Sequence, residues 1–166
     1  MKRIIMCFAM AIAVAAILLV PVGVGAGISD SGTTTISGTV GQTMTVTVPS
    51  NFDMPPFVLG STVNTEGSPK SVIVNTNLTS WGLTAMAHGN YPGGKMKAGT
   101  ISLAHPIRIK GGTMVSYADL SDAALTTVAA GQNGPQTITV NFSQQVAANE
   151  PAGTYQIIVV IAASGS

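Results

Sequence analysis

Two short segments of the chain alternate strictly between apolar and polar side chains. The segment TMTVTV (residues 43–48) places a methionine and two valines on one face and threonines on the other, and TITVNF (residues 137–142) repeats the arrangement. Successive side chains of an extended strand point to opposite faces, so this pattern is typical of a strand with one buried face. The sequence therefore predicts half-buried antiparallel strands around a shared core.

Further candidate strands are separated by turn residues. Gly, Pro and Asn fill the gaps in segments such as VPSNFDMPP, HGNYPGGK and GQNGPQ, and these residues favour tight turns. No internal repeat or long linker divides the chain, so we expect one all-β domain, an immunoglobulin-like antiparallel β-sandwich of seven to nine strands. The further strand candidates are residues 34–40, 56–60, 71–75, 82–87, 106–110 and 154–162.

One segment, ADLSDAALTTVAAG (residues 118–131), suggests a short helix instead of a strand. Asp119 or Ser121 could cap it, and Gly131 would end it. Asp119 and Asp122 are three residues apart, and two carboxylates at a helix start favour its dipole more often than they hold an ion. We therefore expect one short helix beside the sheets.

The first 26 residues have the composition of a secretory signal peptide. Lys2 and Arg3 precede an apolar run that ends in a Pro/Gly segment with small residues. The alternative is a retained membrane anchor, because residues 4–20 approach the roughly 17 to 25 residues that span a bilayer. Cleavage after Ala26 would leave residues 27–166 as the β-sandwich domain of a secreted, cell-surface protein.

The chain after this leader carries little charge and no cysteine. Cys7, the only cysteine, lies inside the apolar run, so the domain that remains after cleavage cannot form disulfide bonds. Five basic residues stand against six acidic ones. Binding to nucleic acid depends on many Lys and Arg contacts with phosphates, so this balance argues against it. Ser, Thr, Asn, Gln and Gly dominate, as they do on secreted β-proteins and adhesive surface subunits.

The last predicted strand, TYQIIVVIA (residues 154–162), is apolar on both faces. Two interpretations follow. The strand could be central and covered on both sides, or one face could be left for a partner. An uncovered edge of this composition would be prone to aggregation.

Trp81, the only tryptophan, is followed at alternate positions by Leu83, Ala85 and Ala87, which places all four on one face of a strand. A large aromatic on an inward face is usually core packing. Stacking on a carbohydrate would need the indole on the outer face or in a loop, ideally with a second aromatic. Tyr91, in the HGNYPGGK loop, is the best candidate for that second ring.

Four of the five mature basic residues fall within sixteen positions of the sequence. This local basic patch could contact an acidic wall polymer or a glycan. The alternative is a solvated outer face whose charges block pairing at a sheet edge. Together with Tyr91, the candidate contact residues are Lys95, Lys97, Arg108 and Lys110.

Catalytic and metal-binding patterns are absent from the sequence. His88 and His105 are the only histidines, no serine lies in a G-x-S-x-G turn, and no zinc or calcium spacing occurs. We therefore expect no enzyme, no metal and no cofactor. Asn77 and Asn141 fit the N-x-Ser/Thr pattern of glycosylation acceptors.

Trp81-Gly82-Leu83 matches the signature of the WxL family of cell-surface domains. Its setting is also similar, with an Asn/Thr turn before it and a PIRI strand after it. The ending VNFSQQVAANEPAGTYQIIVVIAAS resembles the last hairpin of such domains. The family's second motif is kept only as Tyr155, because Ile and Val stand where Trp and Leu would be. The resemblance covers residues 33–163 and implies an exported β-sandwich that associates with the cell wall.

Two functional hypotheses follow. In the first, the protein is a non-catalytic module that binds a polymer or glycan of the cell envelope. In the second, it is a subunit of a surface filament or array, in which the apolar final strand or the segment GISDSGTTTISG pairs with a neighbour's sheet edge.

Overall fold

Strand β4 (Trp81–Ala87) shows how the alternating sequence is used. The computed structural model of the chain describes residues 37–165. In β4, Trp81 is 3 % exposed, and Leu83, Ala85 and Ala87 are fully buried at 0 %. The residues between them are half-buried. The predicted common face of Trp81 and its alternate neighbours is therefore confirmed, and it is an inner face.

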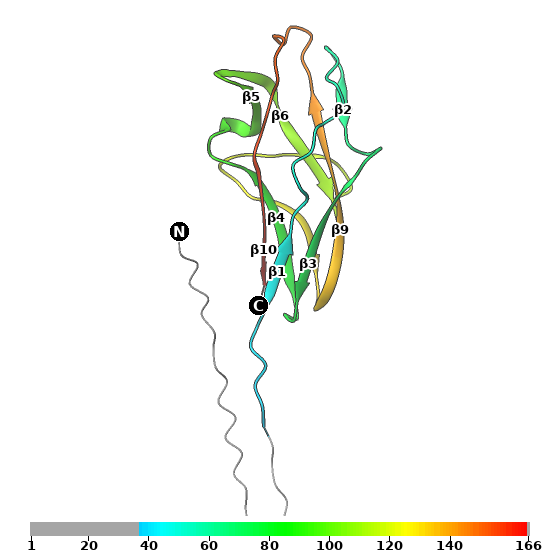
Figure 1. The fold of residues 1–166 in the computed structure, drawn as a ribbon, viewed down its shortest axis with the longest axis vertical. Coiled ribbons are helices and arrows are strands. Elements are labelled where there is room, and N and C mark those ends of the chain that lie inside the picture. The colour runs from blue at the N-terminus through cyan, green and yellow to red at the C-terminus, as the bar shows by residue number, and fades with distance from the viewer. Residues whose placement is uncertain (1–36, 166) are drawn as a thin grey trace, which may run out of the picture. The chain divides into compact units, whose positions relative to one another are not determined.

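The strands form two antiparallel sheets (Figure 1). The larger sheet has the order β1-β3-β9-β6-β5, with β2 added to β9 and β7 added to β6, and the smaller has the order β10-β4-β8. Besides β4, the elements are β1 (Met44–Thr47), β2 (Thr62–Asn64), β3 (Lys70–Thr76), the 3-10 turn η1 (Pro92–Gly94), β5 (Lys95–Ala98), β6 (Ile101–Gly111), β7 (Ala118–Asp119), β8 (Thr126–Gly131), β9 (Gly134–Gln145) and β10 (Val159–Gly165).

The core lies between the two sheets. One continuous cluster of buried side chains joins Val72 and Phe142 of the larger sheet to Leu83 and Val128 of the smaller one. Its members are removed from water, and this burial is the main stabilising force in a domain of this kind. The expected all-β architecture with two packed sheets is confirmed. The described residues contain ten strands, more than the predicted seven to nine, because short strands such as β2 and β7 add to the larger sheet.

The predicted helix over residues 118–131 is wrong. The segment forms β7, a loop and then β8, which pairs with β4. The register shifts between Leu83 and Thr84, so Val128 and Ala129 are both buried in succession. Such a bulge breaks the period of two, which removes the strand signal from the sequence. Among the described residues, the one helical element is the single turn η1.

Other strand predictions were met in part. Residues 71–75, 82–87 and 106–110 lie within β3, β4 and β6. Residues 56–60 form a loop and turn, and the described part of the strand predicted at 34–40 is unpaired. The strand predicted at 154–162 pairs as β10 only from Val159 onward.

Some predictions fall outside the described residues. These are the signal peptide of residues 1–26, Cys7 within it, and residues 34–36. From residue 37 to residue 165, no helix is long and apolar enough to cross a membrane.

Candidate functional site

One edge of β10 has no hydrogen-bonding partner among residues 37–165. The other edge is engaged, since Ile158 O accepts from His88 N at 2.9 Å and Gln156 exchanges bonds of 2.9 and 2.8 Å with Lys97. The register of β10 with β4 continues the same pattern. Because bonding residues alternate along an antiparallel strand, the even-numbered residues point their backbone groups toward β4 and β5. The odd-numbered residues of 155–163 therefore present an unpaired edge.

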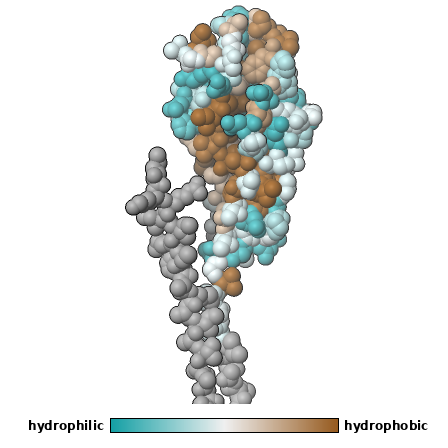
Figure 2. Space-filling view, viewed as in Figure 1, coloured by the Kyte–Doolittle hydropathy of each residue, from teal (hydrophilic) through white to brown (hydrophobic). Residues whose placement is uncertain are grey.

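The side chains beside this edge are apolar and incompletely covered. Val159, Ile161 and Ala163 turn toward the core, yet they are only half-buried. On the outer face, Ile158 is 51 % exposed and Val160 is 40 % exposed. The space-filling view shows an apolar stripe on the side of the molecule where Figure 1 draws β10 (Figure 2). Both faces of this strand thus carry apolar surface that solvent reaches.

Strand β1 ends the larger sheet on the same flank. Strand β8 lies beside β6, so β10, on the other side of β4, lies toward β3 and β1. A Cβ placed on Gly165 would meet Leu78, just after β3, at 3.0 Å. The inward side chains of β1, Met44 and Val46, are also half-buried. The flank between these two edge strands is therefore incompletely covered, although Met54 and Phe57 of the segment that follows β1 also pack partly against the core.

The chain that precedes β1 is hydrogen-bonded to the rest of the domain only from Gly41 onward. Asn77 accepts from Thr43 N at 2.8 Å through its side-chain oxygen and donates to Gly41 O at 2.8 Å through its side-chain nitrogen. Thr76 Oγ1 also donates to Thr43 O at 2.7 Å. In contrast, Val40 is 84 % exposed, and residues 37–42 are all exposed and unpaired with any strand. We call residues 33–42 the N-terminal arm.

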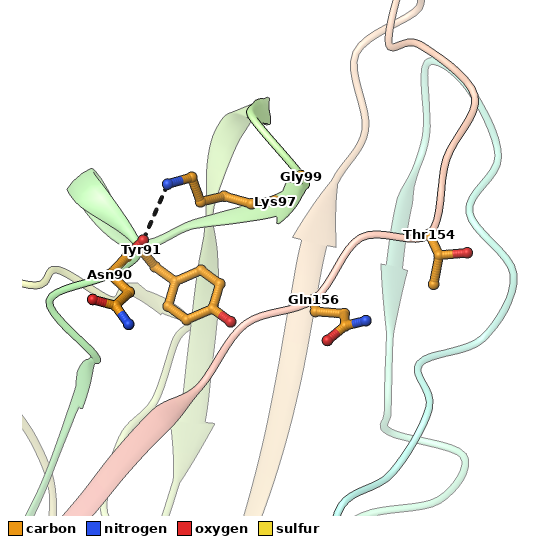
Figure 3. Close-up of a pocket in the computed structure, with 6 residues that line it drawn as sticks. All are labelled: Asn90, Tyr91, Lys97, Gly99, Thr154 and Gln156. Carbon is orange, nitrogen blue, oxygen red and sulfur yellow. Dashed lines mark hydrogen bonds between the residues drawn. The ribbon is translucent and has the colours of Figure 1, made fainter.

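A polar hollow lies at the start of the segment that leads into β10 (Figure 3). Its volume is about 310 Å³. Lys97 Nζ donates to Asn90 O at 3.1 Å, and the Tyr91 ring lies on the same side, with Gln156 across from it. The lining residues are Asn90, Tyr91, Lys97, Gly99, Thr154 and Gln156. Phenol, amide and hydroxyl groups beside one aromatic ring suit a sugar better than an apolar ligand.

The predicted basic patch is divided in the structure. Tyr91 and Lys97 line the hollow, but Lys95 does not. Arg108 and Lys110 instead lie around the ring of Tyr117, at 5.8 and 5.7 Å from its centroid. Each also has an acidic neighbour, which reduces the positive potential available to an acidic polymer.

Tyr117 is the centre of this second cluster. Arg108 Nε lies 3.2 Å from Asp119, and Lys110 Nζ lies 3.9 Å from Glu66. Tyr117 Oη donates to Glu66 at 3.1 Å. Burial, the hydrogen bond to Glu66 and the charge of Glu66 raise the pKa of Tyr117 to about 12. Sequence reasoning singled out Arg108 and Lys110 but not their partners, because the members of the cluster are up to 53 positions apart.

Trp81 is a core residue. Its Nε1 donates to Gln132 O at 2.7 Å, so the one polar atom of the buried indole is satisfied. Leu83 is also fully buried. Tyr155 packs partly against the core and donates to Pro151 O at 2.7 Å. These three residues of the WxL-like pattern therefore support the sandwich.

The two glycosylation candidates differ in their surroundings. Asn77 is exposed, and its side chain holds the start of β1. Asn141 is half-buried on β9 opposite Lys110, and its Oδ1 has no hydrogen-bond partner within the described residues. Glycosylation at either position stays a prediction.

The histidines and carboxylates of the described residues do not gather into a site. No group of three His, Cys, Asp or Glu side chains in residues 37–165 could hold a metal ion. His88 Nδ1 accepts from Asn90 N at 3.2 Å, and Asp122 accepts from Gly93 N at 2.8 Å. Both contacts shape the turn around η1.

Comparison with protein-family models and with curated proteins gives no match for this chain. The resemblance to WxL domains therefore rests on the residues that carry it.

Proposed function

We propose that this protein is an exported, non-catalytic subunit of a cell-surface filament or array, and that its copies join by β-strand addition at the free edge of β10. The observation that carries the proposal is the unpaired edge of residues 155–163. Its odd-numbered residues offer backbone donors and acceptors outward, and their side chains line an apolar flank that is incompletely covered.

An added strand would satisfy both features at once. Its backbone would bond to the outward N–H and C=O groups, and its side chains would cover Val159, Ile161 and Ala163. Proteins normally protect such an edge with charges, prolines or bulges. Residues 154–165 contain no charged residue and no proline. An edge left in this state favours a partner strand over solvent.

Replacement of Ala163 by proline tests the proposal. Proline removes the N–H of residue 163, which points away from β4, and so it costs no bond inside the sheet. The matched control is Ala163→Ser, which keeps that N–H. Both variants are expressed as the full-length chain and purified after export. Their folding is checked by the fluorescence emission of the buried Trp81.

We expect the unmodified protein and Ala163→Ser to form larger species as concentration rises, measured by light scattering after size exclusion and by electron microscopy. Ala163→Pro should require at least tenfold more protein for the same degree of assembly. A wild-type protein that stays monomeric from micromolar to millimolar concentration would refute strand addition. A folded Ala163→Pro that assembles as the wild type does would also refute it.

Binding to an envelope glycan is the second candidate function, and the hollow at Tyr91 is the observation that favours it. The ring of Tyr91 lines this hollow together with the polar residues Asn90, Gln156 and Thr154. Sedimentation of the protein with isolated envelopes tests this role, with Tyr91→Ala as the variant and Tyr155→Phe as a control outside the hollow. Binding unchanged by Tyr91→Ala would contradict it.

A further inference from the structure

We infer that the strand added to the free edge of β10 is the N-terminal arm, residues 33–42, of a second copy of this chain. This inference rests on the proposed function and names its donor.

The described part of the arm exposes an apolar side chain and makes no strand pairing. Val40 is 84 % exposed, although valine is among the residues most often buried. Residues 37–40 make no strand pairing, and the hold exerted by Asn77 begins only at Gly41. An unpaired, exposed segment that carries an exposed valine has the features of a strand that pairs with the edge of another sheet.

The sequence of the arm suits a strand with one covered face. Six of the eight residues in TTTISGTV (residues 33–40) are β-branched, and such residues fit the pleated surface of a sheet. Ile36 and Val40 fall on one face, with Gly38 between them. Thr35, Ser37 and Thr39 fall on the other. A strand with this pattern places its apolar face inward and its hydroxyl groups in solvent.

The lengths and charges of donor and edge agree. At about 3.3 Å per residue, the ten residues of the arm and the nine of the edge at 155–163 both span roughly 30 Å. Neither residues 33–42 nor residues 154–165 contain a charged side chain. No repulsion between like charges opposes the pairing, so salt should change it little.

The hydrogen bonds that fix the C-terminal end of the arm favour pairing with the β10 edge of a second copy over pairing with the β10 edge of the same chain. Thr43 and Gly41 are bonded to Asn77 in the antiparallel pairing of β1 with β3. Figure 1 draws the chain that leads into β1, in cyan, as a thin trace that continues the line of the strand. To lie along its own β10, the arm would have to reverse immediately before Gly41. Pairing with the edge of a second copy needs no such reversal.

Charged substitutions on the two faces of the arm test the donor. The variant Ile36→Asp with Val40→Asp places carboxylates on the proposed inner face. The matched control is Thr35→Asp with Thr39→Asp, which adds the same charge to the same segment on the other face. Val40 is exposed in the single molecule, so Val40→Asp leaves the core intact. Each variant is expressed as the full-length chain and purified after export. Mass spectrometry of the purified protein determines where its N-terminus lies.

We expect the inner-face variant to need at least tenfold more protein to assemble, while the outer-face control stays within threefold of the wild type. Equal assembly by the inner-face variant would overturn the arm as the donor, yet strand addition would stand. A wild type that stays monomeric would refute the proposed assembly itself, so the two failures are distinguishable.

A synthetic peptide of residues 33–42 provides a second measurement. It should bind the inner-face variant, whose own edge is intact, and it should dissolve wild-type assemblies. A peptide with Ile36→Asp and Val40→Asp should do neither. An absence of peptide binding to folded protein would count against the donor. Peptide binding to an unmodified wild type that itself stays monomeric would show that the edge accepts the arm but that copies of the chain do not assemble, which would overturn the proposed assembly.

Discussion

Two glycines at adjacent rungs of the β4–β8 ladder should respond oppositely to replacement by alanine. Gly131 lies opposite Trp81, and a Cβ at this position would overlap the indole and lie 2.5 Å from Gln136 Oε1. The indole cannot move aside freely, because it is buried and bonded to Gln132 O. Gly82, the next residue after Trp81, has nothing within 4 Å of its Cβ position.

The magnitudes follow from this geometry. Overpacking a tight core costs roughly 1 to 3 kcal/mol. Alanine in a strand regains about 0.5 to 1 kcal/mol relative to glycine, because it loses less backbone entropy on folding. Gly131→Ala should therefore lower the free energy of unfolding by about 1 to 2 kcal/mol. Gly82→Ala should raise it by about 0.5 kcal/mol. In a domain of this size, each kcal/mol shifts Tm by about 4 °C.

Urea unfolding measured by Trp81 fluorescence and by far-ultraviolet dichroism checks both variants, since the chain has one tryptophan. We expect the midpoint to fall for Gly131→Ala and to rise slightly for Gly82→Ala, with similar slopes. The reasoning is refuted if Gly131→Ala unfolds at the same urea concentration as Gly82→Ala, or at a higher one. Red-shifted emission from folded wild type would also contradict the buried indole.

Two further predictions concern polar contacts. Thr65 is buried, and its Oγ1 accepts a hydrogen bond from Phe142 N at 2.9 Å. Thr65→Val should leave that N–H unpaired and lower the free energy of unfolding, measured in urea, by about 1 to 3 kcal/mol. An unchanged urea midpoint would contradict this prediction. The raised pKa of Tyr117, about 12, means that the folded state holds this proton more tightly than the unfolded state does. Its stabilising effect is complete below pH 10 and is lost as pH rises to 12. The urea midpoint of wild type should thus fall more than that of Tyr117→Phe across this window, and parallel curves would contradict the prediction.

The elements that sequence predicted well are those in which one residue in two is buried without interruption. Strand β4 is the clearest case, and its tryptophan was correctly placed inside. The error at residues 118–131 has a physical cause, because the bulge at Val128 and Ala129 buries neighbours in succession and removes the alternation that would have marked a strand.

The interaction surface was only partly predictable. Apolar residues on both faces of the last strand suggested either a central strand or a strand left for a partner, and composition alone could not decide. The answer depends on sheet order, which places β10 at an edge. The cluster of Glu66, Tyr117 and Lys110 was missed for a similar reason, since only tertiary pairing brings those residues together.

The unpaired edge and the free arm belong to the same molecule, and this makes any string of such molecules directional. A contact between two different surfaces repeats without closing unless the rotation forms a ring. One terminus of an open string would then display an empty groove, and the other an unused tail. Its two tips would be chemically distinct.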